Sequence, residues 1–158
     1  MTARLATASD IPEIVRVTNA AYRVEDFFID GDRTNADEVA GKMAEPGSCF
    51  LVVDASVGDG LAASVAVDVR GDRAYFGMLA VSPDHQRTGL GRVLIDAIAA
   101  HARAAGCLAL DIDVVNLREE LPAFYTAMGF VETGTSPFFK RHAVKRPVHL
   151  ILMSKSLI

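Results

Sequence analysis

The sequence predicts one domain, residues 1–158, of the α/β (α+β) class, with about four helices flanking a mixed, mostly antiparallel sheet of about seven strands. Three observations support this prediction. Stretches with apolar residues at alternate positions are interspersed with stretches that have apolar residues three and four positions apart. Two of the strands are joined by a turn at Gly71-Asp72, a pair of residues typical of an antiparallel hairpin. Two others are separated by a long helix, which favours parallel neighbours joined by a right-handed crossover.

Composition limits the class of protein. The chain has 158 residues, of which 51% are hydrophobic, and this is enough for one compact domain. The net charge of −4 argues against a nucleic-acid partner. No stretch reaches the roughly 18 apolar residues of a membrane span, and the first ten residues lack the apolar segment of a signal peptide. We therefore expect a soluble, cytoplasmic protein without a membrane partner, in which Cys49 and Cys107 are buried free thiols.

The N-terminal part is expected to form a short strand and two helices. The strand is predicted at residues 4–8. Asp10 followed by Glu13 resembles a capping box at the start of the first helix. Thr34 and Asp37 give the start signal of the second.

Three antiparallel strands are expected next, at residues 49–54, 61–69 and 74–81. The turn Gly58-Asp59-Gly60 joins the first two, and Gly71-Asp72 joins the second to the third.

The last part of the chain alternates helices and strands. A long amphipathic helix is expected to run to about Ala105, and a strand follows at residues 108–114. A short helix is expected over 121–128, before an edge hairpin formed by residues 130–133 and 148–154.

The segment between the strand at 74–81 and the long helix predicts an anion site. The first backbone N–H groups of a helix have no internal partners, and the helix dipole is positive there. Gly89 and Gly91 remove the Cβ atoms that would keep a phosphate away from those amides, while Arg87 and Arg92 add charge. The segment therefore points to a ligand with a pyrophosphate, the alternative being a helix cap that needs flexible glycines.

Two motifs carry a family resemblance. Leu79-Ala80-Val81-Ser82-Pro83, followed by Gln86-x-x-Gly89-x-Gly91, resembles the acyl-CoA signature of the GCN5-related N-acetyltransferases (GNAT family). A second signature of that family is matched by Asn116 and by Phe124-Tyr125-x-x-x-Gly129-Phe130. The resemblance extends from about Arg4 to the C-terminus and implies a GNAT-like acyl-CoA N-acyltransferase fold. It also implies acetyl transfer from the cosubstrate acetyl-CoA to a primary amine, by direct attack in a ternary complex.

The resemblance further implies where acetyl-CoA binds. The strand at 74–81 would carry a bulge and diverge from the strand at 108–114, so that the pantetheine arm pairs with the backbone of Leu79 and Val81. Backbone N–H groups near these residues would also stabilise the oxyanion. The predicted coenzyme-binding residues are Leu79, Ala80, Val81, Gln86, Arg87, Thr88, Gly89, Leu90, Gly91, Arg92 and Asn116.

Two catalytic residues follow from the same resemblance. Tyr125 matches the position whose hydroxyl protonates the departing thiolate, although its apolar neighbours also fit a core tyrosine. Asp111 and Asp113 share one face of their strand, because side chains alternate with period two. Asp111 falls where some relatives place a general base that acts directly or through water. Asp113 is an alternative base, and a solvated strand end is the structural alternative.

The acceptor is the least defined part of the prediction. The segment between the first two helices contains Glu25, Asp26, Asp30, Asp32 and Arg33, and the resemblance implies that it forms one wall of the acceptor site. Its surplus of carboxylates would favour a small-molecule or peptide amine, the alternative being an ordinary acidic surface loop. A homodimer is compatible with such a fold, and the Cys and His spacing suggests no metal site. The competing function is that of a non-catalytic acyl-CoA binding or sensing domain.

Overall fold

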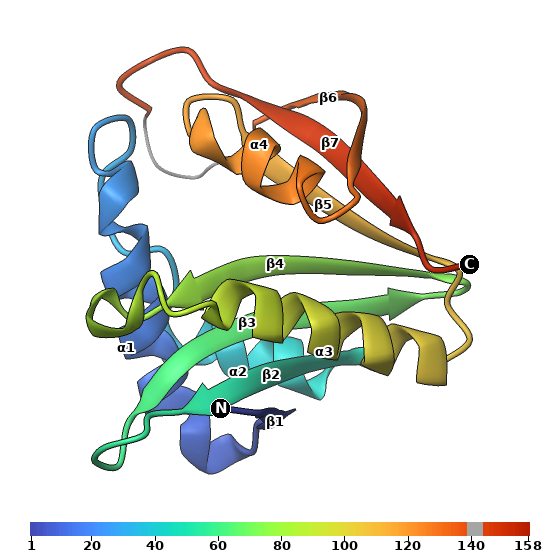
Figure 1. Ribbon diagram of the computed structural model, residues 1–158. Helices are drawn as coiled ribbons and strands as arrows, with labels where there is room; N and C mark the ends of the chain where they lie inside the picture. Colours follow the sequence, from blue (N-terminus) through green and yellow to red (C-terminus); the bar gives the residue numbers. More distant parts are fainter. Residues whose placement is uncertain (139–143) are drawn as a thin grey trace.

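The strands form a single seven-stranded sheet in the order β1-β2-β3-β4-β5-β7-β6 (Figure 1). The computed structural model describes residues 1–138 and 144–158. The strands are β1 (Ala3–Leu5), β2 (Ser48–Asp54), β3 (Leu61–Arg70), β4 (Arg73–Val81), β5 (Ala109–Val115), β6 (Val131–Pro137) and β7 (His149–Ser156). All neighbouring strands are antiparallel except β4 and β5, which are parallel. The predicted fold class is therefore confirmed.

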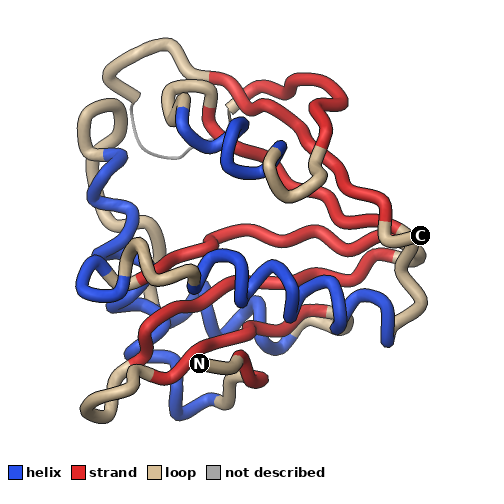
Figure 2. The backbone as a smooth tube through the Cα atoms, viewed as in Figure 1, coloured by secondary structure: helices blue, strands red, loops and turns tan. Residues whose placement is uncertain are grey.

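Helices cover both faces of the sheet (Figures 1 and 2). The α-helices are α1 (Ile11–Tyr22), α2 (Ala36–Ala44), α3 (Leu90–Ala104) and α4 (Glu120–Thr126). Single 3-10 turns precede α1 (η1, Ala8–Asp10), follow it (η2, Arg23–Glu25) and follow β4 (η3, Pro83–His85). Leu94 and Ile98 of α3 pack with Tyr125 of α4 in one core, whereas Ile14 of α1 packs with Val39 of α2 in a second core.

The parallel pair β4–β5 is joined at one end only. Its register runs from Arg73 opposite Ala109 to Tyr75 opposite Asp111, and no further pairs follow. Figure 2 shows the two strands close together near the C-terminus and separating toward the other end. In the same region β4 carries a bulge, because Gly77 to Ala80 spans one residue more than the partner segment of β3. The separated ends leave one edge of β4 without a neighbouring strand in the described part of the chain.

The start of the chain differs from its prediction. β1 ends at Leu5 rather than residue 8, because the chain turns there into η1. The capping box predicted from Asp10 and Glu13 is wrong. The Asp10 carboxylate instead accepts the backbone N–H of Thr7 (2.8 Å), and Glu13 accepts the backbone N–H of Leu61 (2.9 Å).

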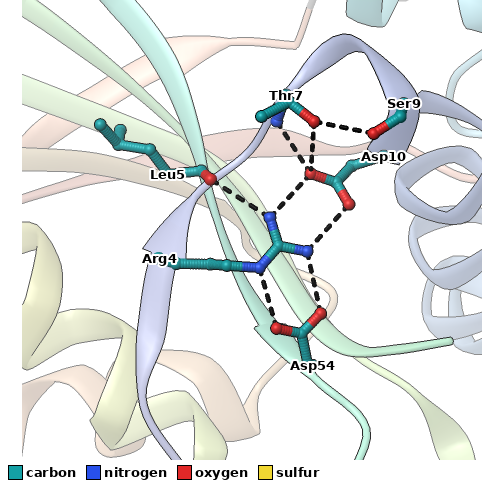
Figure 3. A network of polar contacts seen from close by, with 6 residues as sticks. All are labelled: Arg4, Leu5, Thr7, Ser9, Asp10 and Asp54. Carbon is teal, nitrogen blue, oxygen red and sulfur yellow. Dashed lines mark hydrogen bonds and ion pairs between the residues drawn. The ribbon is translucent and has the colours of Figure 1, made fainter. Parts of the chain in front are cut away.

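One arginine explains this difference. The Arg4 guanidinium donates two hydrogen bonds to Asp10 (both 2.9 Å) and two to Asp54 (both 2.8 Å), as Figure 3 shows. These contacts join β1, the start of α1 and the end of β2. Arg4 holds the pKa of Asp10 at about 2, below its usual value.

Smaller features agree more closely with the sequence. The second helix is capped by Asn35, one residue after the predicted Thr34, through the Glu38 backbone N–H (2.9 Å). Cys49 and Cys107 are free thiols; Cys107 is buried and Cys49 is half-buried. Within residues 1–138 and 144–158, no helix combines the length and the apolar character needed to cross a bilayer.

Candidate active site

A cleft of ≈ 820 Å³ lies where β4 and β5 separate. Its walls come from the second half of β4, the η3–α3 segment, β5 and α4. Tyr22, Glu25 and Arg33, from the end of α1 and the segment after it, close the remaining side. The cleft therefore exists because the strand pairing ends at Tyr75. The last wall includes Glu25 and Arg33, from the segment that was expected to border the acceptor.

The η3–α3 segment is a cradle of free backbone amides. None of the N–H groups from Gln86 to Arg92 donates to a backbone carbonyl in the described chain. Arg87 and Gly89 have positive φ angles, 64° and 83°, which turn successive peptide groups toward the same space. A Cβ on Gly91 would lie 3.2 Å from Phe124 Cζ, so a side chain there would crowd the cleft wall. These residues fit a pyrophosphate, which needs several N–H donors and close backbone approach.

The bulge of β4 presents a second set of backbone groups. Met78 has a φ of 55°, a left-handed conformation that is rare for a residue other than glycine. Strain of this kind concentrates at functional sites, where the surrounding structure holds it in place. Leu79 and Val81, on either side of the buried Ala80, line the cleft. Their edge of the strand is available to an extended arm that pairs with it as an added strand would.

Tyr125 of α4 has its hydroxyl in the cleft. The side chain is 5% exposed, and its ring packs edge-on against Phe124 and Phe130 at centroid distances of 5.1 and 5.5 Å. Burial raises the pKa of Tyr125, so the phenol stays protonated. The hydroxyl forms no hydrogen bond with any described residue. Tyr125 is thus a core tyrosine whose polar end remains available to a ligand.

The two carboxylates of β5 lie in different surroundings. Asp111 accepts two hydrogen bonds from Arg73 (both 2.7 Å) and another from Ser154, and Arg73 lowers the pKa of Asp111. Asp111 does not line the cleft, whereas Asp113 does. Asp113 accepts a hydrogen bond from Tyr75 Oη (3.1 Å). No Lys or Arg of the described chain lies within ion-pair distance of Asp113.

Several side chains at this end of the cleft were not singled out from the sequence. Tyr75 donates to Asp113, and burial raises the pKa of Tyr75, with a further contribution from the Asp113 carboxylate. Arg118, which follows β5, pairs with Glu25 (3.1 Å) and Glu120 (3.3 Å). Tyr22, the last residue of α1, also lines the cleft. The sequence did contain a signal for Tyr75. It lies two positions before Gly77 and four before Leu79, so period-two alternation places the three residues on one face of β4.

Most of the predicted coenzyme-binding residues lie together. The residues that line the cleft are Leu79, Val81, Gln86, Arg87, Gly89, Leu90, Gly91 and Arg92. Ala80, Thr88 and Asn116 do not line it. Asn116 instead exchanges two hydrogen bonds with the backbone of His149 (2.8 and 3.0 Å), which fixes the end of β5 against β7. Coenzyme contacts stay predictions for all of these residues, and the geometry favours the eight that line the cleft.

The acidic residues after α1 mostly face a neighbouring cavity. This cavity, of ≈ 500 Å³, is lined by Asp26, Asp30 and Asp32, none of which lines the main cleft. Asp30 pairs with Lys145 and Asp32 pairs with Arg23, both at 2.7 Å. Glu25 is the one acidic residue of this loop that lines both spaces. Separately, the part of the chain that the structure describes contains no cluster of His, Cys, Asp or Glu suited to a metal ion.

Comparison with known proteins agrees with this geometry. The profile of the Acetyltransferase (GNAT) family matches residues 12–130. N-acetyltransferase 8 of Homo sapiens is 29% identical over 122 residues, a match that covers 73% of this chain and 54% of that protein. The chain therefore spans about half the length of this relative.

Solved structures share the fold over the whole chain. The smu.2055 protein of Streptococcus mutans UA159 has a TM-score of 0.80 and 21% identity, and the match covers 100% of both chains. The acetyltransferase yncA of Salmonella typhimurium, solved with its cofactor acetyl-CoA, has a TM-score of 0.77 and 21% identity. That match covers 100% of this chain and 94% of yncA. At this level of identity the likeness concerns the fold.

Proposed function

Because the chain belongs to the acetyltransferase (GNAT) family, we propose that it transfers the acetyl group of acetyl-CoA to a primary amine in a ternary complex. One observation carries the proposal: the cleft joins a cradle of free amides to an unpartnered, protonated tyrosine. A diphosphate and a departing thiolate are the two groups that these features would serve. Residues 1–158 would make up one catalytic domain.

In the proposed complex, the backbone from Gln86 to Arg92 binds the pyrophosphate, with Arg87 and Arg92 beside it. The pantetheine arm lies along the free edge of β4 and pairs with the backbone of Leu79 and Val81. Binding therefore uses main-chain groups at the free edge of β4, of which the Val81 carbonyl accepts a hydrogen bond from Gln86 Nε2 (3.3 Å) in the unbound chain. Little reorganisation is needed on binding, which favours affinity.

The acetyl carbonyl would lie at the bulge of β4. Backbone N–H groups between Met78 and Val81 would donate to its oxygen as the negative charge develops. In a regular strand the peptide N–H groups point toward the neighbouring strands. The left-handed conformation of Met78 changes the direction of the peptide group at this position.

Asp113 is the residue that we expect to bind and deprotonate the acceptor amine, because it lines the cleft and has no cationic partner in the described chain. It would bind the ammonium form and accept one of its protons, directly or through water, which frees the nitrogen lone pair to attack the carbonyl. Tyr75 would hold the Asp113 carboxylate in place. The role predicted for Asp111 is the alternative, and its ion pair with Arg73 stands against it.

Tyr125 would protonate the sulfur as the carbon–sulfur bond breaks. Burial raises the pKa of this phenol, so Tyr125 is in the protonated form that a general acid requires.

The test is thiol release from acetyl-CoA over a panel of amines of different size and charge. We expect amine-dependent release from the wild-type chain and saturable coenzyme A binding. If the protein binds coenzyme A but no amine in the panel accelerates thiol release, the binding or sensing function replaces the enzymatic one. If coenzyme A does not bind, the cradle assignment is wrong.

A further inference from the structure

Most of the N–H donors of the Arg33 guanidinium, in the cleft wall formed by the segment after α1, have no partner in the described chain. Arg33 lines both the cleft and the neighbouring cavity, yet its side chain is only 25% exposed. Its nearest carboxylate is Glu38, with Nη1 3.8 Å from Oε1, and that oxygen already accepts the Thr34 hydroxyl at 2.7 Å. Arg33 donates no hydrogen bond to any described residue. These free N–H groups at the cleft wall can donate charge-assisted hydrogen bonds to an anionic ligand.

The position of Arg33 is fixed by its surroundings. The guanidinium carbon lies 5.3 Å from the centre of the Tyr22 ring, a cation–π contact that orients its plane. The next residue, Thr34, exchanges two hydrogen bonds with Asn19 of α1 (2.9 and 3.0 Å). The backbone beside Arg33 is therefore tied to a helix. Arg33 is held at the cleft wall before any ligand arrives.

The other arginine at this end of the cleft is already occupied. The Arg118 guanidinium forms ion pairs with both Glu25 and Glu120, so most of its charge is neutralised within the protein. Asp113 shows the opposite situation to Arg118, because no Lys or Arg of the described chain pairs with it. One open guanidinium and one open carboxylate therefore face the same cleft. Tyr22, whose ring contacts the Arg33 guanidinium, lines the same cleft as Asp113.

We infer that the acceptor is an amino acid or a small amino-acid derivative, whose carboxylate binds Arg33 while its amine faces Asp113. This inference rests on the proposed acetyl transfer. The planar fork of arginine matches a carboxylate through two parallel hydrogen bonds, which gives both affinity and orientation. A polyamine, by contrast, would place a second cation against Arg33. The carboxylates that would attract such a cation, Asp30 and Asp32, are paired in the neighbouring cavity.

The experiment compares α-amino acids with their carboxamides, which keep the amine and side chain but lose the negative charge. Thiol release from acetyl-CoA is measured for the wild type, Arg33→Gln, Arg33→Lys and Arg23→Gln. Arg23 is the matched control, because it lies in the same segment but pairs with Asp32 and does not line the cleft.

We expect the wild type to prefer the carboxylates. Loss of a charge-assisted contact should raise KM for amino acids about 10- to 100-fold in Arg33→Gln and should change the carboxamide KM far less, so that the preference for carboxylates is lost. Arg33→Lys should restore part of the preference, since it keeps the charge but not the fork. Arg23→Gln should behave as the wild type.

Two results would overturn the inference while leaving acetyl transfer intact. One is equal or better use of the carboxamides by the wild type, and the other is an unchanged preference in Arg33→Gln. If the protein binds coenzyme A but none of the amines tested accelerates thiol release, the proposed function is wrong, and the inference is wrong with it.

Discussion

The N-terminal ion-pair network and the cleft both gather charged side chains, but only the first is complete. Arg4 makes charge-assisted hydrogen bonds with Asp10 and Asp54, so both carboxylates are satisfied within the fold (Figure 3). In the cleft, Asp113 has only the Tyr75 hydroxyl, and Arg33 donates no hydrogen bond to a described residue. A complete network stabilises the folded chain, whereas an incomplete one is retained at some cost and is suited to a ligand.

The same contrast appears within a single strand. Asp111 and Asp113 lie on the same face of β5, two residues apart. Asp111 lies where β4 and β5 still pair, and Arg73 engages it; Asp113 lies beyond the last pair and lines the cleft. The point at which two strands separate therefore decides which carboxylate is structural and which is available for chemistry.

The largest effect should come from exchanging these two carboxylates for amides. We expect Asp113→Asn to lower kcat by about 10²–10⁴-fold, because it removes the proton acceptor, and to leave coenzyme A affinity unchanged. Asp111→Asn should retain a kcat close to that of the wild type and instead lower the thermal stability. Steady-state kinetics and thermal unfolding of both variants check this. The opposite pattern would restore Asp111 as the base.

The next effect concerns the amide cradle. Gly89→Asp would place a carboxylate beside the pyrophosphate, and we expect at least about 100-fold weaker coenzyme A binding from like-charge repulsion. Gly58→Asp is the matched control. Gly58 has the same left-handed conformation (φ 84°, against 83° for Gly89), neither Cβ would meet an atom within 4 Å, and Gly58 lies in a turn far from the cradle along the chain. Equal calorimetric affinities of the two variants would show that backbone strain, not the cradle, governs binding.

A smaller effect is expected at the leaving group. Tyr125→Phe keeps the ring contacts with Phe124 and Phe130 but removes the hydroxyl that faces the cleft. We expect kcat to fall about 100-fold, the lower limit of the range for general acid catalysis, with unchanged coenzyme A affinity. Single-turnover kinetics separate the chemical step from product release. An unchanged chemical rate would make Tyr125 a core residue only.

Much of the fold could be predicted, because it depends on short-range patterns. Alternation over residues 61–69 and 74–81, with Gly71-Asp72 between them, fixed an antiparallel hairpin whose observed bounds agree closely with the prediction. The false capping box shows the limit. Glu13 is three residues after Asp10, as the motif requires, but Arg4 and the distant Asp54 determine where the Asp10 carboxylate points. A contact across 50 positions leaves no local signature.

The site divides in the same way. The cradle is contiguous, so the spacing of Gly89 and Gly91 was sufficient to place it. The choice between Asp111 and Asp113 depends on the separation of β4 from β5, a tertiary property that period-two alternation does not contain. Tyr22 and Arg33 belong to the site only because α1 and the segment after it close one side of the cleft.

The smallest effect on activity should come from the complete network, where Asp10→Asn changes stability instead. The pKa of Asp10 is about 2 in the folded protein, below the roughly 3.9 of a free aspartate, so its contribution is full above about pH 4 and is lost as the pH falls through 2. We expect Asp10→Asn to lower the free energy of unfolding at pH 7 by about 1–2 kcal/mol, equivalent to about 3–6 °C in Tm, with kcat unchanged.

The acid limb of the stability profile tests the cause of that loss. Since protonation removes the Asp10 charge in the wild type, the difference in Tm between wild type and Asp10→Asn should shrink as the pH falls from 4 toward 2. Asp59→Asn, in the exposed turn between β2 and β3, should show no difference at any pH. If the Tm difference between the wild type and Asp10→Asn stays constant with pH, the substitution acts through geometry rather than charge. Loss of activity in Asp10→Asn would mean that the Arg4 network and the cleft are coupled rather than independent.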